Sequence, residues 1–140
     1  MMMAHFALSD IDDHKFYQHE KTSRVALGLA GSEAQPFKVW VDNWVAAGTK
    51  DSPWPMTLHA AHDDTEIDLT LVPAKPLVLQ GDNGLSRKGS EAGNASYYYS
   101  YTDLQTRGVI MAGGDRYEVS GHSWLDRECP GGPSPGIDAL

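Results

Sequence analysis

The chain alternates short runs of apolar residues with turn-forming residues along most of its length. The runs are rich in Val, Ile, Thr, Tyr and Trp, and most of the 14 Gly and 8 Pro residues fall in clusters between them. This pattern is typical of antiparallel all-β proteins. We therefore predict strands over seven ranges: 4–9, 37–45, 56–61, 66–72, 95–102, 106–112 and 115–125.

Turn residues mark two hairpins within this pattern. The segment 62–64 (His-Asp-Asp) separates two alternating runs, and Gly113-Gly114 separates two more. A Gly-Gly pair supplies the positive φ that tight hairpins require. The one helix that the pattern allows is 14–29, although its apolar positions are poorly spaced for a helix. Residues 73–94 form a long loop of the kind that is usually functional or disordered.

Composition narrows the class of protein. The length of 140 residues suits one domain, and 41% apolar residues is enough for a core. The net charge is −8 and no cluster of Lys and Arg is present, which argues against nucleic acid or an anionic membrane surface as a partner. The single cysteine, Cys129, excludes an internal disulfide. No signal-peptide pattern or membrane-spanning apolar run is present.

The segment 119–128 is the strongest candidate for chemistry. If it is a strand, its alternating side chains place His122, Trp124, Asp126 and Glu128 on one face. A carboxylate beside an aromatic surface and a second carboxylate has a raised pKa, so Asp126 could act as a general acid. The alternative is a solvent-facing strand with an ordinary cluster of charges.

Two aromatic groups are candidates for a ligand-binding surface. Tyr97, Tyr99 and Tyr101 share one face of a predicted strand, where their rings could line a cavity for a large apolar ligand. The alternative is a half-buried strand with tyrosines at the rim of the sheet. Trp40 and Trp44, four residues apart, would share one face of the strand 37–45 and could line a pocket or make a domain contact. The alternative is that they are ordinary core residues, because tryptophan is common in cores.

Spacing gives no support for a metal ion or a cofactor. The six histidines are scattered, and none has HExxH or paired Cys/His spacing, so we expect no metal site. The Gly-rich stretch 81–89 lacks the spacing of a phosphate-binding loop. No serine lies in a nucleophile elbow. We therefore expect no cofactor.

Five segments resemble one family in the right order: "MAHFALSD", "FKVWVDNW", "LTLVPAKPLVLQGDNGLSRKG", "GNASYYYSYT" and "VSGHSWLDRE". They are similar to the bacterial lipocalin-like proteins related to carotenoid 1,2-hydratase, many of which are described only as predicted secreted hydrolases. The family has two lipocalin-like β-barrels. The resemblance implies that residues 1–128 are a truncated N-terminal β domain, either a barrel or a strongly curved, incomplete sheet. Residues 129–140 are expected to be a disordered Pro/Gly-rich tail.

The resemblance also implies a function, which is the binding of a large apolar or isoprenoid ligand and hydration of a C=C bond. Asp126 would protonate the double bond, Trp124 and the three tyrosines would form the walls, and Glu128 or His122 would orient the water. One alternative is a lipid-binding module without catalysis, and another is an inactive truncated gene product. A structural network of Asp126 and Arg127 that ties the strand to its neighbour is the rival explanation for these charges.

Two further expectations concern partners and location. We expect an apolar small molecule as the ligand, and an incomplete sheet would leave open edges through which a homodimer could form. Members of the resembling family are often exported or periplasmic, but the chain itself carries no feature that assigns a compartment.

Overall fold

The structure is a computed structural model, and it describes residues 1–88 and 95–130. The part 89–94 of the predicted loop and the part 131–140 of the predicted tail lie outside these described residues. The last strand continues through Cys129 and Pro130, two residues beyond the expected end of the β domain.

The described residues form antiparallel strands and contain no helix, which confirms the predicted all-β class. The strands are β1 Met2–Asp10, β2 Lys15–Ser23, β3 Ala30–Glu33, β4 Lys38–Val41, β5 Trp44–Ala47, β6 Met56–His62, β7 Thr65–Pro73, β8 Val78–Leu79, β9 Leu85–Arg87, β10 Ala95–Ala112 and β11 Asp115–Pro130.

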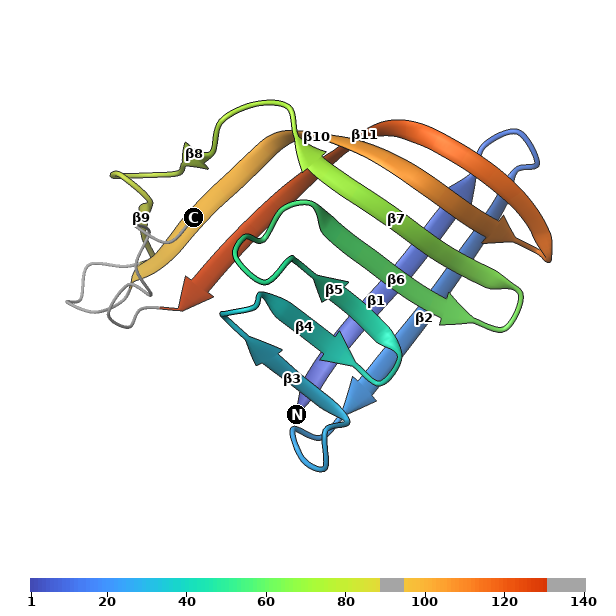
Figure 1. The fold of residues 1–140 in the computed structure, drawn as a ribbon, viewed down its shortest axis with the longest axis horizontal. Helices are drawn as coiled ribbons and strands as arrows, with labels where there is room; N and C mark the ends of the chain where they lie inside the picture. Colours follow the sequence, from blue (N-terminus) through green and yellow to red (C-terminus); the bar gives the residue numbers. More distant parts are fainter. Residues whose placement is uncertain (89–94, 131–140) are drawn as a thin grey trace. The chain divides into compact units, whose positions relative to one another are not determined.

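These strands form two sheets (Figure 1). One is the hairpin β1–β2. The other has the order β11-β10-β7-β6-β5-β4-β3, with β8 and β9 paired to β10. This order is open, with β3 at one end and β11 at the other, so the strands do not close into a barrel. An open order agrees with the expected curved sheet or incomplete barrel.

The chain divides into two compact units. The first unit consists of Met1–Val72 and Thr106–Gly121, and the second unit consists of the described residues within Pro73–Gln105 and His122–Leu140. Strands β10 and β11 contribute to both, because the part of each strand next to their shared turn belongs to the first unit and the rest of each strand to the second unit.

The core of the first unit lies between the β1–β2 hairpin and the larger sheet. Figure 1 shows this hairpin crossing behind β4–β6. Phe6 of β1 packs edge-on against Trp44 of β5, with ring centroids 5.9 Å apart, and Ala60 of β6 completes the cluster. Ala4 and Leu8 flank Phe6 in this contact, as the period of two in a strand requires. We call the face of β4–β7 that carries Trp44 and Ala60 the inner face.

The prediction of a helix over 14–29 is wrong, because Lys15–Ser23 forms strand β2. This strand pairs with β1 along its whole length, so that His19 lies directly opposite Phe6. The two rings contact each other with centroids 5.8 Å apart. Pairing with β1 therefore decides the conformation of a segment whose own spacing is ambiguous.

The prediction of a single strand over 37–45 is also wrong, because the chain turns at Asp42 and forms the hairpin β4–β5. Asp42 has a φ of 54°, a left-handed conformation that Asp tolerates better than most residues. Val41 and Trp44 are direct cross-strand partners and share the inner face. Trp40, one residue before Val41, therefore has its side chain on the other face, and the two tryptophans do not share a face.

Both predicted hairpins are confirmed. Strands β6 and β7 are joined at Asp63 and Asp64, and His62 is the direct partner of Thr65. The turn between β10 and β11 contains Gly113 and Gly114, both with positive φ. The strands predicted over 95–102 and 106–112 are two parts of one long strand, β10.

Candidate functional site

Asp126, the predicted acid, lies in a hydrogen-bonded network within the second unit. The hydroxyl of Ser100 on β10 donates to Asp126 Oδ1 at 2.5 Å, and Trp124 Nε1–H donates to the same oxygen at 2.7 Å. Gln80 Nε2–H in turn donates to Ser100 Oγ at 3.0 Å. Because Ser100 is completely buried, its hydroxyl needs both bonds.

Glu128 is held in a similar way two residues further along β11. Lys88 Nζ lies 2.5 Å from Glu128 Oε1, and the buried hydroxyl of Ser96 donates to the same oxygen. Gln80 and Lys88 both come from the segment that the sequence predicts to be a long loop. The network therefore joins three of the segments on which the family resemblance rests.

The pKa of Asp126 is lowered in the structure, whereas the sequence predicted that it would be raised. Its side chain is exposed, and the hydrogen bonds from Ser100 and then Trp124 hold the pKa of this carboxyl below its usual value. The ion pair with Lys88 and the bond from Ser96 lower the pKa of Glu128 in the same way. The donors Ser100, Ser96 and Lys88 lie on other segments, which local sequence does not reveal, and the aromatic neighbour Trp124 is itself a donor that lowers the pKa of Asp126.

His122 has a different partner. Its Nδ1 lies 2.7 Å from Asp103 Oδ1, and the imidazole side chain is 69% exposed. Lys75 Nζ also approaches Asp103, at 4.0 Å. The role of His122 or Glu128 in orienting a water molecule stays a prediction.

The tyrosines predicted to form the walls of the site lie on the face of β10 opposite to the face that contacts Asp126. Arg127, the residue after Asp126, donates from its guanidinium to the Tyr99 hydroxyl at 3.1 Å, whereas Asp126 bonds to Ser100. Successive side chains of a strand point to opposite faces. The face opposite to Ser100 and Asp126 therefore carries three tyrosines: Tyr97, Tyr99 and Tyr101.

Asp126 and Arg127 together tie β11 to β10 from both faces of the sheet. This is the arrangement that the structural explanation of the charges requires. Trp124, the other predicted wall, is 60% exposed, and its indole N–H is used by Asp126. The catalytic and ligand-binding roles predicted for this group therefore gain no support from its geometry.

An apolar pocket of about 230 Å³ lies in the first unit, between β1 and the inner face of β4–β7. Trp44 contributes to its lining from the inner face, and Trp40 also contributes to it although its side chain lies on the other face of β4. Trp44 is 5% exposed and donates its indole N–H to Ala61 O at 2.9 Å. Trp40 donates to Gly28 O at the same distance.

A second hollow in the first unit, of about 330 Å³, is less suited to an apolar molecule. Asp10, Asp12 and Glu118 contribute to its lining, and Ile11 beside them is 79% exposed. Desolvation and nearby carboxylates raise the pKa of Tyr117 in its lining.

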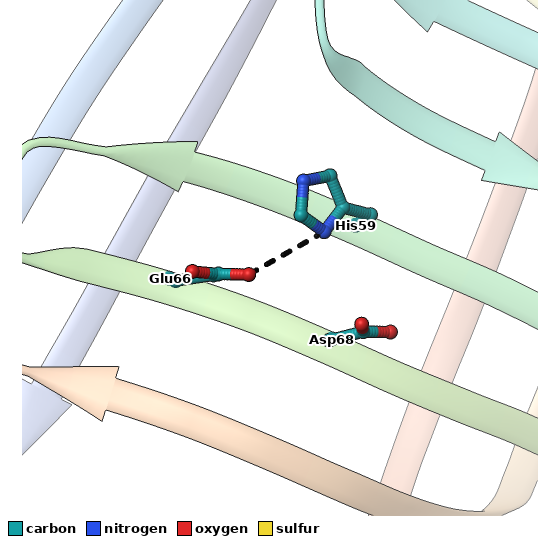
Figure 2. A group of neighbouring side chains, drawn as sticks. All are labelled: His59, Glu66 and Asp68. Atoms are coloured by element: carbon teal, nitrogen blue, oxygen red, sulfur yellow. Dashed lines mark ion pairs between the residues drawn. The ribbon is translucent and has the colours of Figure 1, made fainter. Parts of the chain in front are cut away.

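Sequence reasoning missed one group of side chains, His59, Glu66 and Asp68, on β6 and β7 (Figure 2). The sequence contained a signal for this group, which is the position of the predicted turn between the two strands. A two-residue turn at Asp63 and Asp64 places His59 opposite Asp68, and alternation places Glu66 on the same face as Asp68.

The fold is that of a lipocalin-like all-β protein, as its resemblance implied. A family model described as AttH-like matches residues 1–133, and the chain therefore belongs to the AttH-like family. Among solved structures, a Nitrosomonas europaea protein that is provisionally described as AttH is 36% identical, with a TM-score of 0.79. The match covers 95% of this chain and 41% of that protein, so the chain spans less than half of the length of its relative.

No curated protein matches the chain. Within residues 1–88 and 95–130, no helix has the length and apolar character that crossing a membrane would require.

Proposed function

We propose that this chain binds an apolar chain, such as an isoprenoid, in the pocket between β1 and β4–β7. The apolar lining of this pocket is the observation that carries the proposal. Its volume of about 230 Å³ is slightly below the ~300–1,000 Å³ of most small-molecule sites. The pocket therefore suits a short apolar chain or the end of a longer one.

The pocket also has the chemistry that an apolar ligand needs. Phe6 and Trp44 present ring surface, and Ala46, Leu58 and Ile67 add aliphatic surface. Because the Trp44 indole N–H is already bonded to a backbone carbonyl, a ligand beside it would leave that polar group satisfied. Burial of apolar ligand surface would then supply the binding free energy.

Hydration of a C=C bond, the reaction implied by the resemblance to carotenoid 1,2-hydratase, receives less support. That reaction needs a carboxylic acid that keeps its proton near neutral pH. Asp126 is exposed and has a lowered pKa, which favours the ionised form. These observations favour binding without hydration.

Two adjacent residues of β5 offer a matched test of the proposed pocket. Ala46 contributes to its lining, whereas Ala47 has its side chain on the opposite face of the strand. We expect Ala46→Phe to fill the pocket and weaken binding of the fluorescent polyene cis-parinaric acid by about tenfold or more. Ala47→Phe should change the affinity by less than about twofold.

The measurement is a fluorescence titration of the full chain, followed by displacement of the probe with farnesol. Circular dichroism checks that both variants keep their strands. Mass spectrometry of the farnesol after long incubation should find no gain of water. Absence of saturable binding by the natural sequence, or equal weakening in both variants, would contradict the pocket. Turnover that Asp126→Asn abolishes while binding persists would establish an enzyme instead.

A further inference from the structure

We propose that His59, Glu66 and Asp68 bind a divalent first-row transition metal of the zinc type. The three side chains project from one face of the β6–β7 hairpin, and Figure 2 shows them pointing into the same space. His59 is the neighbour of Ala60, which faces the core, so alternation puts the imidazole on the face opposite to the inner face. The proposed site therefore lies on the opposite face from the apolar pocket, although His59 itself also contributes to the lining of that pocket, and it does not depend on the proposed function.

Antiparallel pairing holds the three residues together. His59 is the direct cross-strand partner of Asp68, and Glu66 is two residues away from Asp68 on the same strand. The two-residue turn after His62 defines this register. Ligands on paired strands are positioned more exactly than ligands on loops, which reduces the entropy lost when an ion binds.

The distances suit one ion after small side-chain rotations. His59 Nδ1 lies 3.8 Å from Glu66 Oε1, and one ligand atom of each residue lies within 4.8 Å of the other two. Around a tetrahedral Zn²⁺ with bonds of about 2.0–2.1 Å, ligand atoms are separated by about 3.4 Å. The side chains of His59 and Glu66 are each 38% exposed, so they have room to close that difference.

The donor set selects the kind of ion. An imidazole nitrogen with two carboxylate oxygens suits Zn²⁺ and its neighbours in the first row, whereas Ca²⁺ and Mg²⁺ prefer oxygen alone. Two carboxylates also neutralise a dication, which would relieve their mutual repulsion on the sheet surface. Three protein ligands leave a further coordination position for water.

The competing interpretation is a simple ion pair between His59 and Glu66, with Asp68 beside it. The chain contains a matched example of such a pair on β1 and β2, where His5 Nδ1 lies 3.7 Å from Glu20 Oε2. Within the described residues, His5 and Glu20 belong to no group of three potential ligands. His5→Gln is therefore a control for metal binding by any exposed histidine.

Calorimetry tests the site. The full chain, freed of metal with a chelator, is titrated with ZnCl₂ and separately with CaCl₂, and Co²⁺ absorption reports inner-sphere ligands. We expect one Zn²⁺ per chain and no comparable binding of Ca²⁺. His59→Gln, Glu66→Gln and Asp68→Asn should each weaken Zn²⁺ binding at least about tenfold, and His5→Gln should not. These near-isosteric changes at half-exposed or exposed positions should leave the fold intact, as circular dichroism will check.

Three outcomes would overturn the proposal. One is the absence of stoichiometric Zn²⁺ binding by the natural chain. The second is equal loss of affinity in His59→Gln and His5→Gln, which would indicate only adventitious binding by exposed histidines. The third is Ca²⁺ binding as tight as Zn²⁺ binding, which would exclude the nitrogen ligand.

Discussion

At the level of single residues, the partners of a carboxylate decide its chemistry. Asp126 has an aromatic neighbour two residues away, Trp124, whose indole N–H donates to the carboxylate and so favours the charged form. The largest effect on its pKa comes from Ser100, 26 residues away in the chain. A hydroxyl group that donates to the carboxylate stabilises the charged form, so the environment favours an anion rather than an acid.

This pKa shift predicts how stability depends on pH. A carboxyl group whose pKa is lower in the folded state than its unfolded value, about 3.9, stabilises the fold fully above that unfolded value. The contribution disappears as the pH falls through the lowered folded pKa of Asp126. Asp126→Asn should therefore reduce the free energy of unfolding most at neutral pH, and the difference from the natural chain should narrow below about pH 4.

Urea unfolding monitored by tryptophan fluorescence between pH 3 and pH 7 measures this difference. Asp51→Asn serves as a control, because Asp51 is an exposed residue in the connection between β5 and β6. Its profile should follow that of the natural chain. A difference for Asp126→Asn that is constant with pH would show that the shift has no thermodynamic effect.

At the level of elements, one glycine allows two strands of the larger sheet to pack closely. A Cβ atom at Gly108 of β10 would lie 2.0 Å from the carbonyl oxygen of Asp68 and 2.9 Å from Leu69 Cα on β7. Backbone atoms cannot rotate out of the way as the end of a side chain can. Any larger residue would have to push β10 away from β7.

We therefore expect Gly108→Ala to lower the free energy of unfolding by about 2–4 kcal/mol. Gly121 of β11 offers the matched control, since no atom outside its immediate chain neighbours lies within 4 Å of the Cβ position there. Gly121→Ala should change stability by no more than about 0.5 kcal/mol. Chemical denaturation of both variants makes the comparison, and equal effects would refute the close-packing explanation.

At the level of the whole molecule, the net charge governs how strongly one copy of the chain repels another. The charge is −8 at pH 7, and the isoelectric point is about 5.0. Repulsion between like-charged molecules keeps proteins apart, and this repulsion vanishes at the isoelectric point. Strands β3 and β11 are the outer strands of the larger sheet in the described residues, and outer strands are the places where proteins tend to associate when repulsion is lost.

Solubility should therefore pass through a minimum near pH 5 and recover by pH 7. Turbidity and sedimentation velocity across this range provide the measurement. Replacing two exposed acids, Asp12→Lys and Asp51→Lys, should move the minimum to higher pH. A minimum that stays in place would show that something other than net charge controls association.

Alternation and turn chemistry were sufficient to predict the all-β class, most of the strands and the two hairpins at Asp63-Asp64 and Gly113-Gly114. They failed over 14–29 and at Asp42, and they missed the short strands β3, β8 and β9, the last two of which lie inside the predicted loop 73–94. In the first case, pairing with β1 decided the structure. In the second case, a two-residue turn at 42–43 interrupts a run of apolar residues that local sequence reads as one strand. Local signals identify a strand, but they do not say where it ends or what it meets.

The sequence by itself determined the strand-rich class, the tight turns and the acidic charge, because these depend on residues that are close together in the chain. Only the tertiary structure decided which face of each strand is buried and which groups meet. It separated Trp40 from Trp44 and the tyrosines from Asp126, and it brought His59 next to Glu66. The physical reason is that cross-strand contacts join residues far apart in the chain, and a shift of one residue in register would exchange the two faces.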